Sequence, residues 1–250
     1  MGTLLHCAAD IRHQSGDGCI ESVNVDGTLR MLNIAETLHA RLLHISTISI
    51  AGTDGKEALT EERLYVGQTI SNAYVRSKFL AERAVLQAVA DSKVKATVFR
   101  LGNLSPRRSD GRFRQTPVGG IHDALEGIRI LGCYPAGIAG IQIDLSPVDQ
   151  TAKAVIQLAK YADIHPVTHP FNPHTVTLSG YFPVTAVKPI DDRLFASRLE
   201  QAMGTPALQE KLLPLAHFLS MAADEKGTPT PISNQITMQL LNCIKKNRRL

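Results

Sequence analysis

Strand-like and helix-like patterns alternate along the first hundred residues, and this alternation restricts the folds open to the chain. Short apolar or β-branched runs at 3–8 (TLLHCA), 43–50 (LHISTISI) and 95–104 (KATVFRLGNL) predict buried strands. Between these runs, residues 23–42 and 72–90 carry apolar side chains at helical spacing. Strands that are joined by long helical crossovers run parallel, with right-handed connections. The pattern therefore predicts an α/β fold built on a parallel sheet.

The pattern changes after Ser105. Residues 105–120 (SPRRSDGRFRQTPVGG) predict a polar, basic loop that glycine and proline interrupt. Helical patterns follow at 121–131, at 147–162 and, in two or three pieces, between 191 and 250. Residues 164–190 are rich in proline and β-branched residues, which favours short strands. We therefore expect residues 1–115 to hold the parallel sheet and residues 116–250 to be mostly helical, with some strands that return to the sheet.

The composition excludes several classes of protein. Apolar residues make up 44% of the 250 residues and charged residues 20%, which allows a large core and argues against global disorder. The formal net charge of +4 is too small to indicate a nucleic-acid-binding protein. No apolar run approaches the ~20 residues of a membrane-spanning helix. Four cysteines lie far apart without a C-x-x-C pair, which predicts reduced thiols and a cytoplasmic protein.

No metal site is expected. His165, His169 and His174 follow one another in the segment HPVTHPFNPH. Histidines four residues apart share a metal ion when they lie on a helix, but Pro166 and Pro170 break any helix here. We therefore interpret the three histidines as loop residues.

The helix predicted at 72–90 places a tyrosine and a lysine in its apolar face. On a helical wheel, Tyr74, Lys78 and Glu82 fall within or beside the apolar arc, whereas Ser77 falls on the solvent-facing side. An unpaired buried ammonium costs several kcal/mol, so the lysine needs a reason to be there. One explanation is structural, because Lys78 could extend to solvent with Glu82 as its i+4 partner. The other is functional, because the preceding strand ends at the sheet edge where open α/β folds bind ligands.

The tyrosine and lysine together have a definite chemistry. A phenol has a pKa near 10, and an ammonium about 5 Å away at an effective dielectric of about 20 favours the phenolate by roughly 3 kcal/mol. This shift of about two pKa units would make Tyr74 a general acid near neutral pH. A hydroxyl at the end of the strand, such as that of Thr47, could hold a substrate carbonyl oxygen beside Tyr74. Ser46 and Ser49 are alternatives to Thr47, and Tyr65 lacks a lysine four residues on.

These residues resemble the extended type of the short-chain dehydrogenase/reductase superfamily. Tyr74 and Lys78 match its Tyr-x-x-x-Lys pair, and Thr47 matches its serine or threonine, five residues before a glycine. The closer resemblance is to carrier-linked thioester reductases of nonribosomal peptide and polyketide synthetases, in the branch named for male-sterility proteins. The matching segments are HCAADIRH (6–13), NVDGTLRMLNIA (24–35), ISTISIAG (45–52), LYVGQTISNAYVRSKFLAERAVL (64–86), FRLGNLSPRRSDGRFR (99–114), IDLSPVDQTAKAVIQLA (143–159) and, more loosely, FNPHTVTL (171–178).

The resemblance implies a Rossmann-like fold, NADPH rather than NADH as hydride donor, and an acyl thioester on the phosphopantetheine of a carrier protein as substrate. The product would be an aldehyde or, after a second reduction, an alcohol. Tyr74 would donate the proton, Lys78 would hold the nicotinamide ribose and lower the pKa of the tyrosine, and Thr47 would bind the substrate oxygen. The residues implied to line the cofactor are Ala8, Ala9, Lys78, Arg100, Leu101, Gly102 and Asn103.

One departure from the family pattern concerns the pyrophosphate site. The family begins with a strand and a G-x-x-G-x-x-G turn, whose backbone amides hold the pyrophosphate. Residues 1–30 contain only scattered glycines, and the chain starts where the fourth strand of the family would start. We therefore expect residues 1–115 to be the C-terminal half of a dinucleotide-binding domain and residues 116–250 to be the substrate-binding region. In this interpretation the sequence is a fragment, or another chain or synthetase module supplies the missing half.

The densest basic cluster consists of Arg107, Arg108, Arg112 and Arg114. One interpretation is a solvated surface. The other is a surface that meets an acidic carrier protein or the phosphate of phosphopantetheine, with Ser49 also facing the substrate. Nucleic acid is not expected to bind here, because no aromatic platform accompanies the arginines.

Two other functions are compatible with the same sequence. The chain could be a different extended short-chain enzyme, such as a nucleotide-sugar epimerase or a hydroxysteroid-type dehydrogenase. It could also be an inactive fragment that binds a carrier protein. A serine hydrolase is not indicated, because no G-x-S-x-G motif is present.

Overall fold

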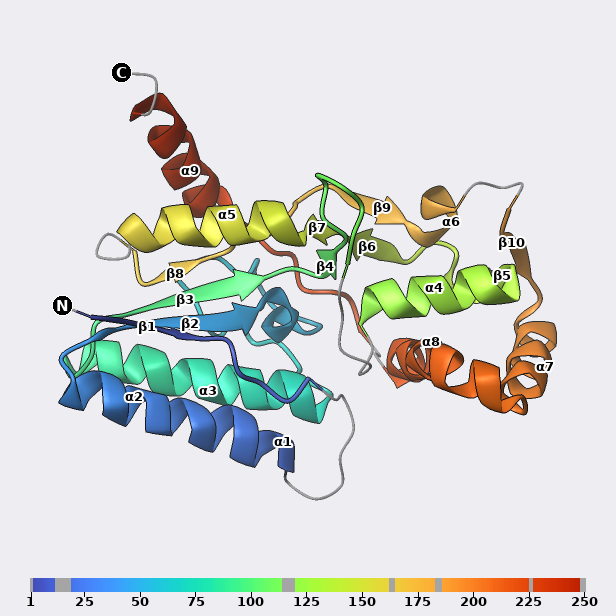
Figure 1. Cartoon of the computed structure of the whole chain (residues 1–250), viewed down its shortest axis with the longest axis horizontal. Coiled ribbons are helices and arrows are strands. Elements are labelled where there is room, and N and C mark those ends of the chain that lie inside the picture. The colour runs from blue at the N-terminus through green and yellow to red at the C-terminus, as the bar shows by residue number, and fades with distance from the viewer. Residues whose placement is uncertain are drawn as a thin grey trace. The chain divides into compact units, whose positions relative to one another are not determined.

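The computed structural model describes residues 2–11, 19–113, 120–161, 165–182, 186–224 and 227–247 (Figure 1). The chain forms two compact units, and each is assembled from separate stretches of sequence. The sheet unit comprises Met1–Gly102, Asp149–Phe171 and Lys226–Leu250. The helical unit comprises Asn103–Val148 and Asn172–Glu225. The chain therefore leaves the sheet unit and returns to it twice, whereas the sequence pattern suggested one division near residue 115.

The sheet unit is built on four parallel strands in the order β1-β2-β3-β8. Their bounds are β1 Thr3–His6, β2 Arg41–Thr47, β3 Ala96–Leu101 and β8 Val167–Thr168. In the register of the sheet, His6 lies opposite His44 and Thr47 lies opposite Leu101. The carboxyl ends of β1, β2 and β3 therefore meet at one edge of the sheet. The predicted α/β fold with a parallel sheet is confirmed.

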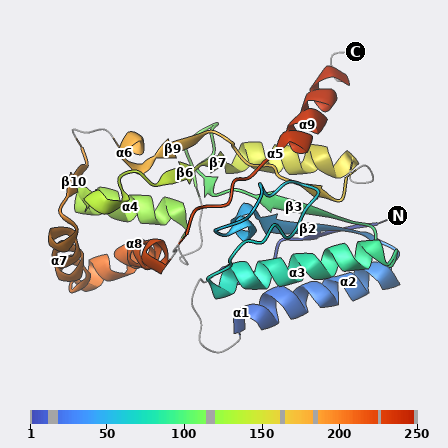
Figure 2. The ribbon, with the colours of Figure 1, turned by 180° about the vertical axis from the view of Figure 1, so that it is seen from behind.

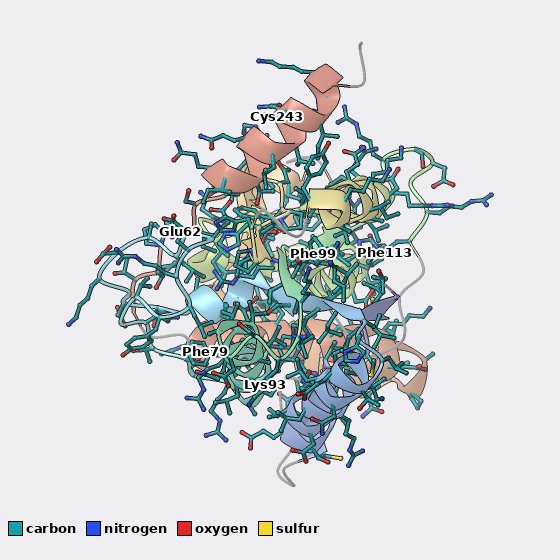
Figure 3. The ribbon with its side chains drawn as sticks, turned by 90° about the vertical axis from the view of Figure 1, so that its left-hand side faces the viewer. Glu62, Phe79, Lys93, Phe99, Phe113 and Cys243 are labelled. Atoms are coloured by element: carbon teal, nitrogen blue, oxygen red, sulfur yellow. The ribbon has the colours of Figure 1, made fainter. Side chains whose placement is uncertain are left out.

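Helices cover both faces of this sheet (Figures 1 and 2). On one face, α2 (Gly27–Thr37) and α3 (Ala73–Ala90) pack through Leu32, Val85 and their neighbours against Leu42 and Val98. On the other face, α5 (Val148–Leu158) packs through Leu158 against Leu43 and the fully buried Phe99 (Figure 3). Alternate residues of β2 and β3 thus serve two different cores, as the period of a strand requires.

The first helical region differs from its prediction at both ends. It consists of α1 (Cys19–Glu21), a π-helical turn η1 (Ser22–Asp26) and α2, which ends at Thr37 rather than Leu42. His39 takes a φ of 47°, and a residue in this left-handed region ends a helix. The chain then enters β2 at Arg41.

The strand predicted to continue through Ile50 stops at Thr47. Residues Ile48–Ala51 form a 3₁₀ turn, η2, whose Ile50 and Ala51 pack against Val75 of α3. A long loop then leads to α3, and the C-terminal segment pairs with it through bridges of Thr53 with Pro229 and of Leu59 with Ile232. The last helix, α9 (Gln235–Asn247), therefore belongs to the sheet unit.

The helical unit has a core of its own around Leu125, Phe195 and Leu212. Its helices are α4 (Ile121–Leu131), α6 (Leu178–Tyr181), α7 (Asp192–Met203) and α8 (Pro206–Asp224). Three two-stranded pairs complete it: β4 (Leu104–Ser105) with β7 (Ser146–Pro147), β5 (Cys133–Pro135) with β10 (Lys188–Ile190), and β6 (Gln142–Asp144) with β9 (Thr175–Thr177). A Cβ at Gly127 would lie 2.9 Å from the Cβ of Leu215, so glycine allows α4 and α8 to approach closely. The prediction of a helix at 121–131 is confirmed.

None of the helices in the described ranges is long and apolar enough to cross a membrane. Among the described residues, no three His, Cys, Asp or Glu side chains gather closely enough to hold a metal ion.

Candidate active site

The helix that carries the tyrosine and lysine begins at a defined cap. The side chain of Asn72 accepts a hydrogen bond from the backbone N–H of Val75 (2.8 Å) and satisfies one of the free donors of the first turn. This cap fixes the start of α3. Tyr74 and Lys78 are four residues apart on this helix, so they lie one turn apart on the face that meets the sheet. Tyr74 packs against the cluster around Ile50 of the η2 turn.

Lys78 is almost fully buried, with 4% of its surface exposed. Its Nζ atom donates a hydrogen bond to the carbonyl oxygen of Ile45 on β2 (2.6 Å). Burial lowers the pKa of Lys78 to about 8, against the opposing influence of the Glu82 carboxylate and of Cys7. The structural explanation from sequence, in which Lys78 reaches solvent beside Glu82, is wrong: Lys78 ends inside the protein on a main-chain carbonyl.

The Tyr74 phenol does not become more acidic in this structure. Burial raises the pKa of Tyr74 to about 12, because the phenolate would lose its hydration. The expected decrease of about two pKa units counted the attraction of the lysine charge at a dielectric near 20 and left out the burial of the phenol. At neutral pH the phenol therefore carries its proton and can act as a donor.

Thr47 and Ser49 remain neighbours although the strand ends between them. The Thr47 hydroxyl oxygen accepts the backbone N–H of Ser49 (3.1 Å) as the cap of the η2 turn, and its hydroxyl donates to the Ser49 hydroxyl oxygen (3.1 Å). The 3₁₀ turn thus brings together two of the hydroxyls that the sequence offers for binding a substrate oxygen. Thr47 lies two residues after Ile45, whose carbonyl binds Lys78.

The four residues implied to pass under a nicotinamide take different positions. Arg100 is fully buried, and its guanidinium binds Glu82, so its side chain is held within the protein. Leu101 packs with Phe99 in the core beneath α5, and Gly102 follows it at the end of β3. Asn103 belongs to the helical unit, where its backbone N–H and side-chain amide both donate to Asp144 (2.7 and 2.5 Å).

Ala8 and Ala9 come one residue after the end of β1, at the carboxyl edge that β1 shares with β2. The next residue, Asp10, is fixed by Asn24, whose side chain accepts from the Asp10 N–H (2.7 Å) and donates to the Asp10 carbonyl oxygen (2.9 Å). The two alanines therefore lie at the same sheet edge as Thr47.

The arginine cluster lies in the helical unit, apart in the chain from the Tyr74 helix. Arg107, Arg108 and Arg112 are exposed, and Arg114 lies outside the described residues. Arg107 forms an ion pair with Asp110 (2.5 Å), and the Arg107 backbone N–H donates to the carbonyl oxygen of Arg112 (3.0 Å). The loop is thus closed on itself by its own contacts and presents its positive charges to solvent.

The helical wheel missed part of the polar core beneath α3. Ser77 is fully buried rather than solvent-facing: its hydroxyl donates to the Tyr74 carbonyl oxygen (2.7 Å) and accepts from the Asn24 side chain (2.8 Å). A wheel shows the faces of one helix but not the neighbour that covers them. The available signal was Asn24 itself, a polar residue within an apolar helical pattern.

Comparison with known proteins places this geometry in a family. Residues 1–155 match the family described as male sterility protein. The chain belongs to this family. It is also 25% identical over 212 residues to the PKS-NRPS hybrid synthetase acdB of Aspergillus candidus, an alignment that covers 81% of this chain and 8% of the synthetase.

Two solved structures extend the comparison of this male sterility family member. A thiolation-reductase di-domain from an archaeal non-ribosomal peptide synthetase is 28% identical, with a TM-score of 0.73, over 98% of this chain and 53% of that one. The terminal R domain from the myxalamid PKS-NRPS pathway has the same fold, with 20% identity, a TM-score of 0.78, and coverage of 96% and 62%. The chain thus spans a small part of the synthetase and between half and two thirds of each solved chain. The predicted membership of the branch named for male-sterility proteins is confirmed, and the chain is similar to reductase domains of non-ribosomal peptide synthetases.

Proposed function

We propose that this chain reduces an acyl thioester, held on the phosphopantetheine of a carrier protein, to an aldehyde with NADPH as hydride donor. The observation that carries the proposal is the placement of Tyr74 and Lys78 one helical turn apart, with Lys78 bound to Ile45 just before the Thr47 turn. The 28% identity to a thiolation-reductase di-domain supports a thioester rather than a free sugar or steroid as substrate.

The chemistry assigned to the chain is acid catalysis and orientation. A bound nicotinamide cofactor would supply the hydride for the thioester carbonyl carbon. Tyr74 would give the carbonyl oxygen its proton, and the Thr47 hydroxyl, turned from Ser49, would donate a hydrogen bond to the same oxygen. The resulting hemithioacetal loses the pantetheine thiol and leaves the aldehyde. The net reaction consumes one thioester, one NADPH and one proton, and yields aldehyde, thiol and NADP⁺. A second round would give the alcohol.

The residues present fit the nicotinamide end of such a cofactor. The Lys78 ammonium has three donors, of which the Ile45 carbonyl takes one, so donors remain for ribose hydroxyls. Ala8, Ala9 and Gly102 are small residues near the carboxyl ends of β1 and β3, where open α/β sheets bind ligands. For the pyrophosphate, the 250 residues contain no G-x-x-G-x-x-G turn. We assign NADPH ahead of NADH on the family resemblance.

We assign the carrier protein to the basic loop of the helical unit. The segment from Arg107 to Arg112 contains three arginines against one aspartate, Asp110, and its charges are exposed. An exposed positive loop favours the encounter with an acidic carrier or with the phosphate of phosphopantetheine. Replacing Arg107, Arg108 and Arg112 together by glutamine should raise the KM for carrier-bound substrate and leave the KM for a free acyl-pantetheine unchanged.

The deciding experiment is a product assay with the whole chain. Acyl-pantetheine thioester is supplied with NADPH or with NADH, and aldehyde, alcohol and released thiol are measured together. The proposal predicts one thiol per aldehyde and faster turnover with NADPH. Conversion of a nucleotide sugar without any turnover of thioester would contradict it.

A further inference from the structure

Glu82 lies one turn beyond Lys78 on α3 and is completely buried. Its Oε1 atom accepts a hydrogen bond from Nε of Arg100 on β3 (2.8 Å) and forms an ion pair with Nη2 of the same arginine (2.6 Å). Its Oε2 atom accepts from the hydroxyl of Ser46 on β2 (2.7 Å). A buried carboxylate needs such partners, because its charge is no longer hydrated. Glu82 therefore joins the helix to two adjacent strands.

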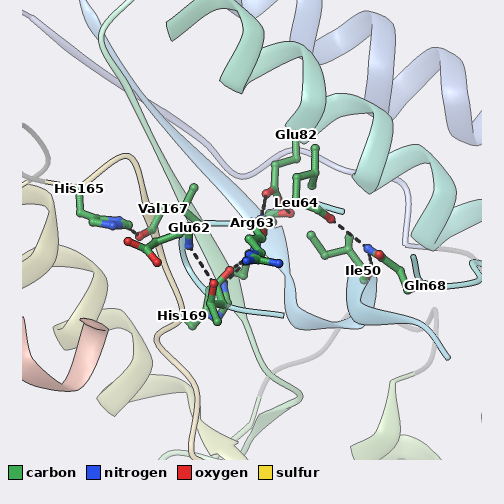
Figure 4. Close-up of polar contacts among 12 residues, drawn as sticks. Ile50, Glu62, Arg63, Leu64, Gln68, Glu82, His165, Val167 and His169 are labelled. Carbon is green, nitrogen blue, oxygen red and sulfur yellow. Dashed lines mark hydrogen bonds and ion pairs between the residues drawn. The ribbon is translucent and has the colours of Figure 1, made fainter. Parts of the chain in front are cut away.

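Arg100 has further partners besides Glu82; of the residues it contacts, Glu82, Arg63 and His169 are labelled in Figure 4. Its Nη1 atom donates to the carbonyl oxygen of Thr60 (3.0 Å) and contacts Nε2 of His169 (2.8 Å), and its Nη2 atom donates to the carbonyl oxygen of Arg63 (2.8 Å). Nδ1 of His169 donates to the carbonyl oxygen of Ser233 (2.6 Å), which leaves Nε2 as the acceptor for Arg100. All three nitrogen atoms of the guanidinium thus have partners, which fix its orientation.

These contacts fasten α3 to β2 at two successive residues. Lys78 binds the carbonyl of Ile45, and Glu82 binds the hydroxyl of Ser46, immediately before Thr47. Rotating α3 by one residue position, or sliding it by one rise of about 1.5 Å, would break both contacts. The same two contacts therefore set where Tyr74 and Lys78 stand relative to Thr47.

We propose that Glu82, clamped between Arg100 and Ser46, is a positioning residue that holds Tyr74 and Lys78 in their working places beside Thr47. The inference rests on the proposed reductase function for its effect on rate. It makes a second prediction that needs no turnover, because a fixed carboxylate one turn from Lys78 also acts on the charge of that lysine.

Lys78 has a small set of ionisable neighbours. Glu82 on its own helix and Cys7 after β1 favour its charged form. His6 on β1 and His44 on β2 lie with their rings 5.4 Å apart, and burial, followed by the Lys78 charge, lowers the pKa of both histidines. Glu82 is the group in this set that supplies a negative charge held in place by hydrogen bonds.

The test is a pH titration of Lys78 in the whole chain, followed by NMR of ¹³C-labelled lysine ε-carbons and assigned with Lys78→Arg. Glu82→Gln removes the charge, and Glu82→Asp keeps the charge but is too short to reach both Arg100 and Ser46. Glu57→Gln is the matched control, because Glu57 forms an exposed ion pair with Arg63 of the same length, 2.6 Å. Folding of each variant is checked by circular dichroism, and kcat and KM are measured with acyl-pantetheine.

Glu82→Gln should lower the titration midpoint of Lys78 by about one pH unit, a tenfold loss of proton affinity, whereas Glu57→Gln should not move it. Glu82→Asp should keep the midpoint within about 0.3 unit and lower kcat at least about tenfold with little change in KM. If Glu82→Gln does not fold, the Glu82→Asp rate decides. An unchanged midpoint in folded Glu82→Gln, or full activity of Glu82→Asp, overturns the proposal. If the wild-type chain reduces no thioester, the reductase function fails, and the titration alone decides the role of Glu82.

Discussion

Arg100 on β3 and Glu82 on α3 form an ion pair of 2.6 Å in which neither side chain is exposed to solvent. The pair lies between the sheet and the helix that carries Tyr74 and Lys78. Family resemblance placed Arg100 beneath a nicotinamide, but its side chain faces Glu82, Thr60, Arg63 and His169. Arg100 therefore acts on the candidate site through the scaffold, and only its backbone remains for a ligand.

Removal of the Arg100 side chain should destabilise the protein strongly. Arg100→Met leaves the Glu82 carboxylate buried without its cation, which we expect to lower the free energy of unfolding by about 3–5 kcal/mol. Arg63→Met breaks an ion pair whose side chains are half-exposed and should cost less than about 1 kcal/mol. Urea unfolding of the two variants measures the difference. Equal effects would contradict the importance of the buried pair.

His169 should make the protein sensitive to acid. Burial, followed by the Arg100 charge, lowers the pKa of His169 from 6.5 to about 3. Between these pH values His169 is protonated in the unfolded chain and neutral in the folded chain. The free energy of unfolding should therefore fall as the pH decreases from above 6.5 toward 3, by about 2 kcal/mol between pH 7 and pH 5. His169→Gln should remove this part of the pH dependence. A variant with the same acid sensitivity as the wild type would show that His169 is not responsible.

Lys78 should change the stability in the same direction as His169, but at higher pH. Its pKa falls from 10.5 to about 8 on burial, so between these pH values the unfolded chain holds more protons than the folded chain. The free energy of unfolding should therefore rise with pH across this window, by about 2 kcal/mol from pH 7 to pH 9.5 relative to Lys78→Met. Parallel unfolding curves at the two pH values check this. If the free energies of unfolding of wild type and Lys78→Met differ by the same amount at pH 7 and at pH 9.5, Lys78 does not have a lowered pKa in the folded protein.

The hydroxyl that binds the substrate oxygen can be identified by substitution. We expect Thr47→Val to lower kcat/KM by about 10²-fold, the usual effect of losing one oxyanion donor. Ser49→Ala should have less than about a threefold effect, because the Ser49 backbone N–H that holds the Thr47 oxygen stays in place. Steady-state kinetics with acyl-pantetheine compares them. The reverse order would assign the substrate oxygen to Ser49.

The parallel sheet and the main helices could be predicted because their signals are local. Helix α3 starts at an asparagine cap, and α4 occupies the predicted residues 121–131. The end of β2 could not be predicted, because Ile48–Ala51 is as β-branched and apolar as the strand before it. Its 3₁₀ turn is stabilised by tertiary packing of Ile50 and Ala51 against α3.

The pair at the candidate site was visible in the sequence, but its environment was not. The spacing of Tyr74 and Lys78 placed both on one helix face, whereas the partner of Lys78 is a main-chain carbonyl that a sequence pattern does not reveal. The sequence pattern also does not show how deeply the Tyr74 phenol is buried. Its pKa was therefore expected to fall, whereas burial raises it. Glu82 and Arg100 meet only because the sheet and helix pack together.

The proposed reduction depends on the Tyr74 phenol as its proton donor. A comparison of kcat for acyl-pantetheine reduction in Tyr74→Phe and Tyr65→Phe tests this role, because Tyr65 is 68% exposed and loses the same hydroxyl. We predict that Tyr74→Phe lowers kcat by about 10²–10⁴-fold, the contribution of a general acid, and that Tyr65→Phe remains within about twofold of the wild type. Near-normal turnover by a folded Tyr74→Phe would contradict the account.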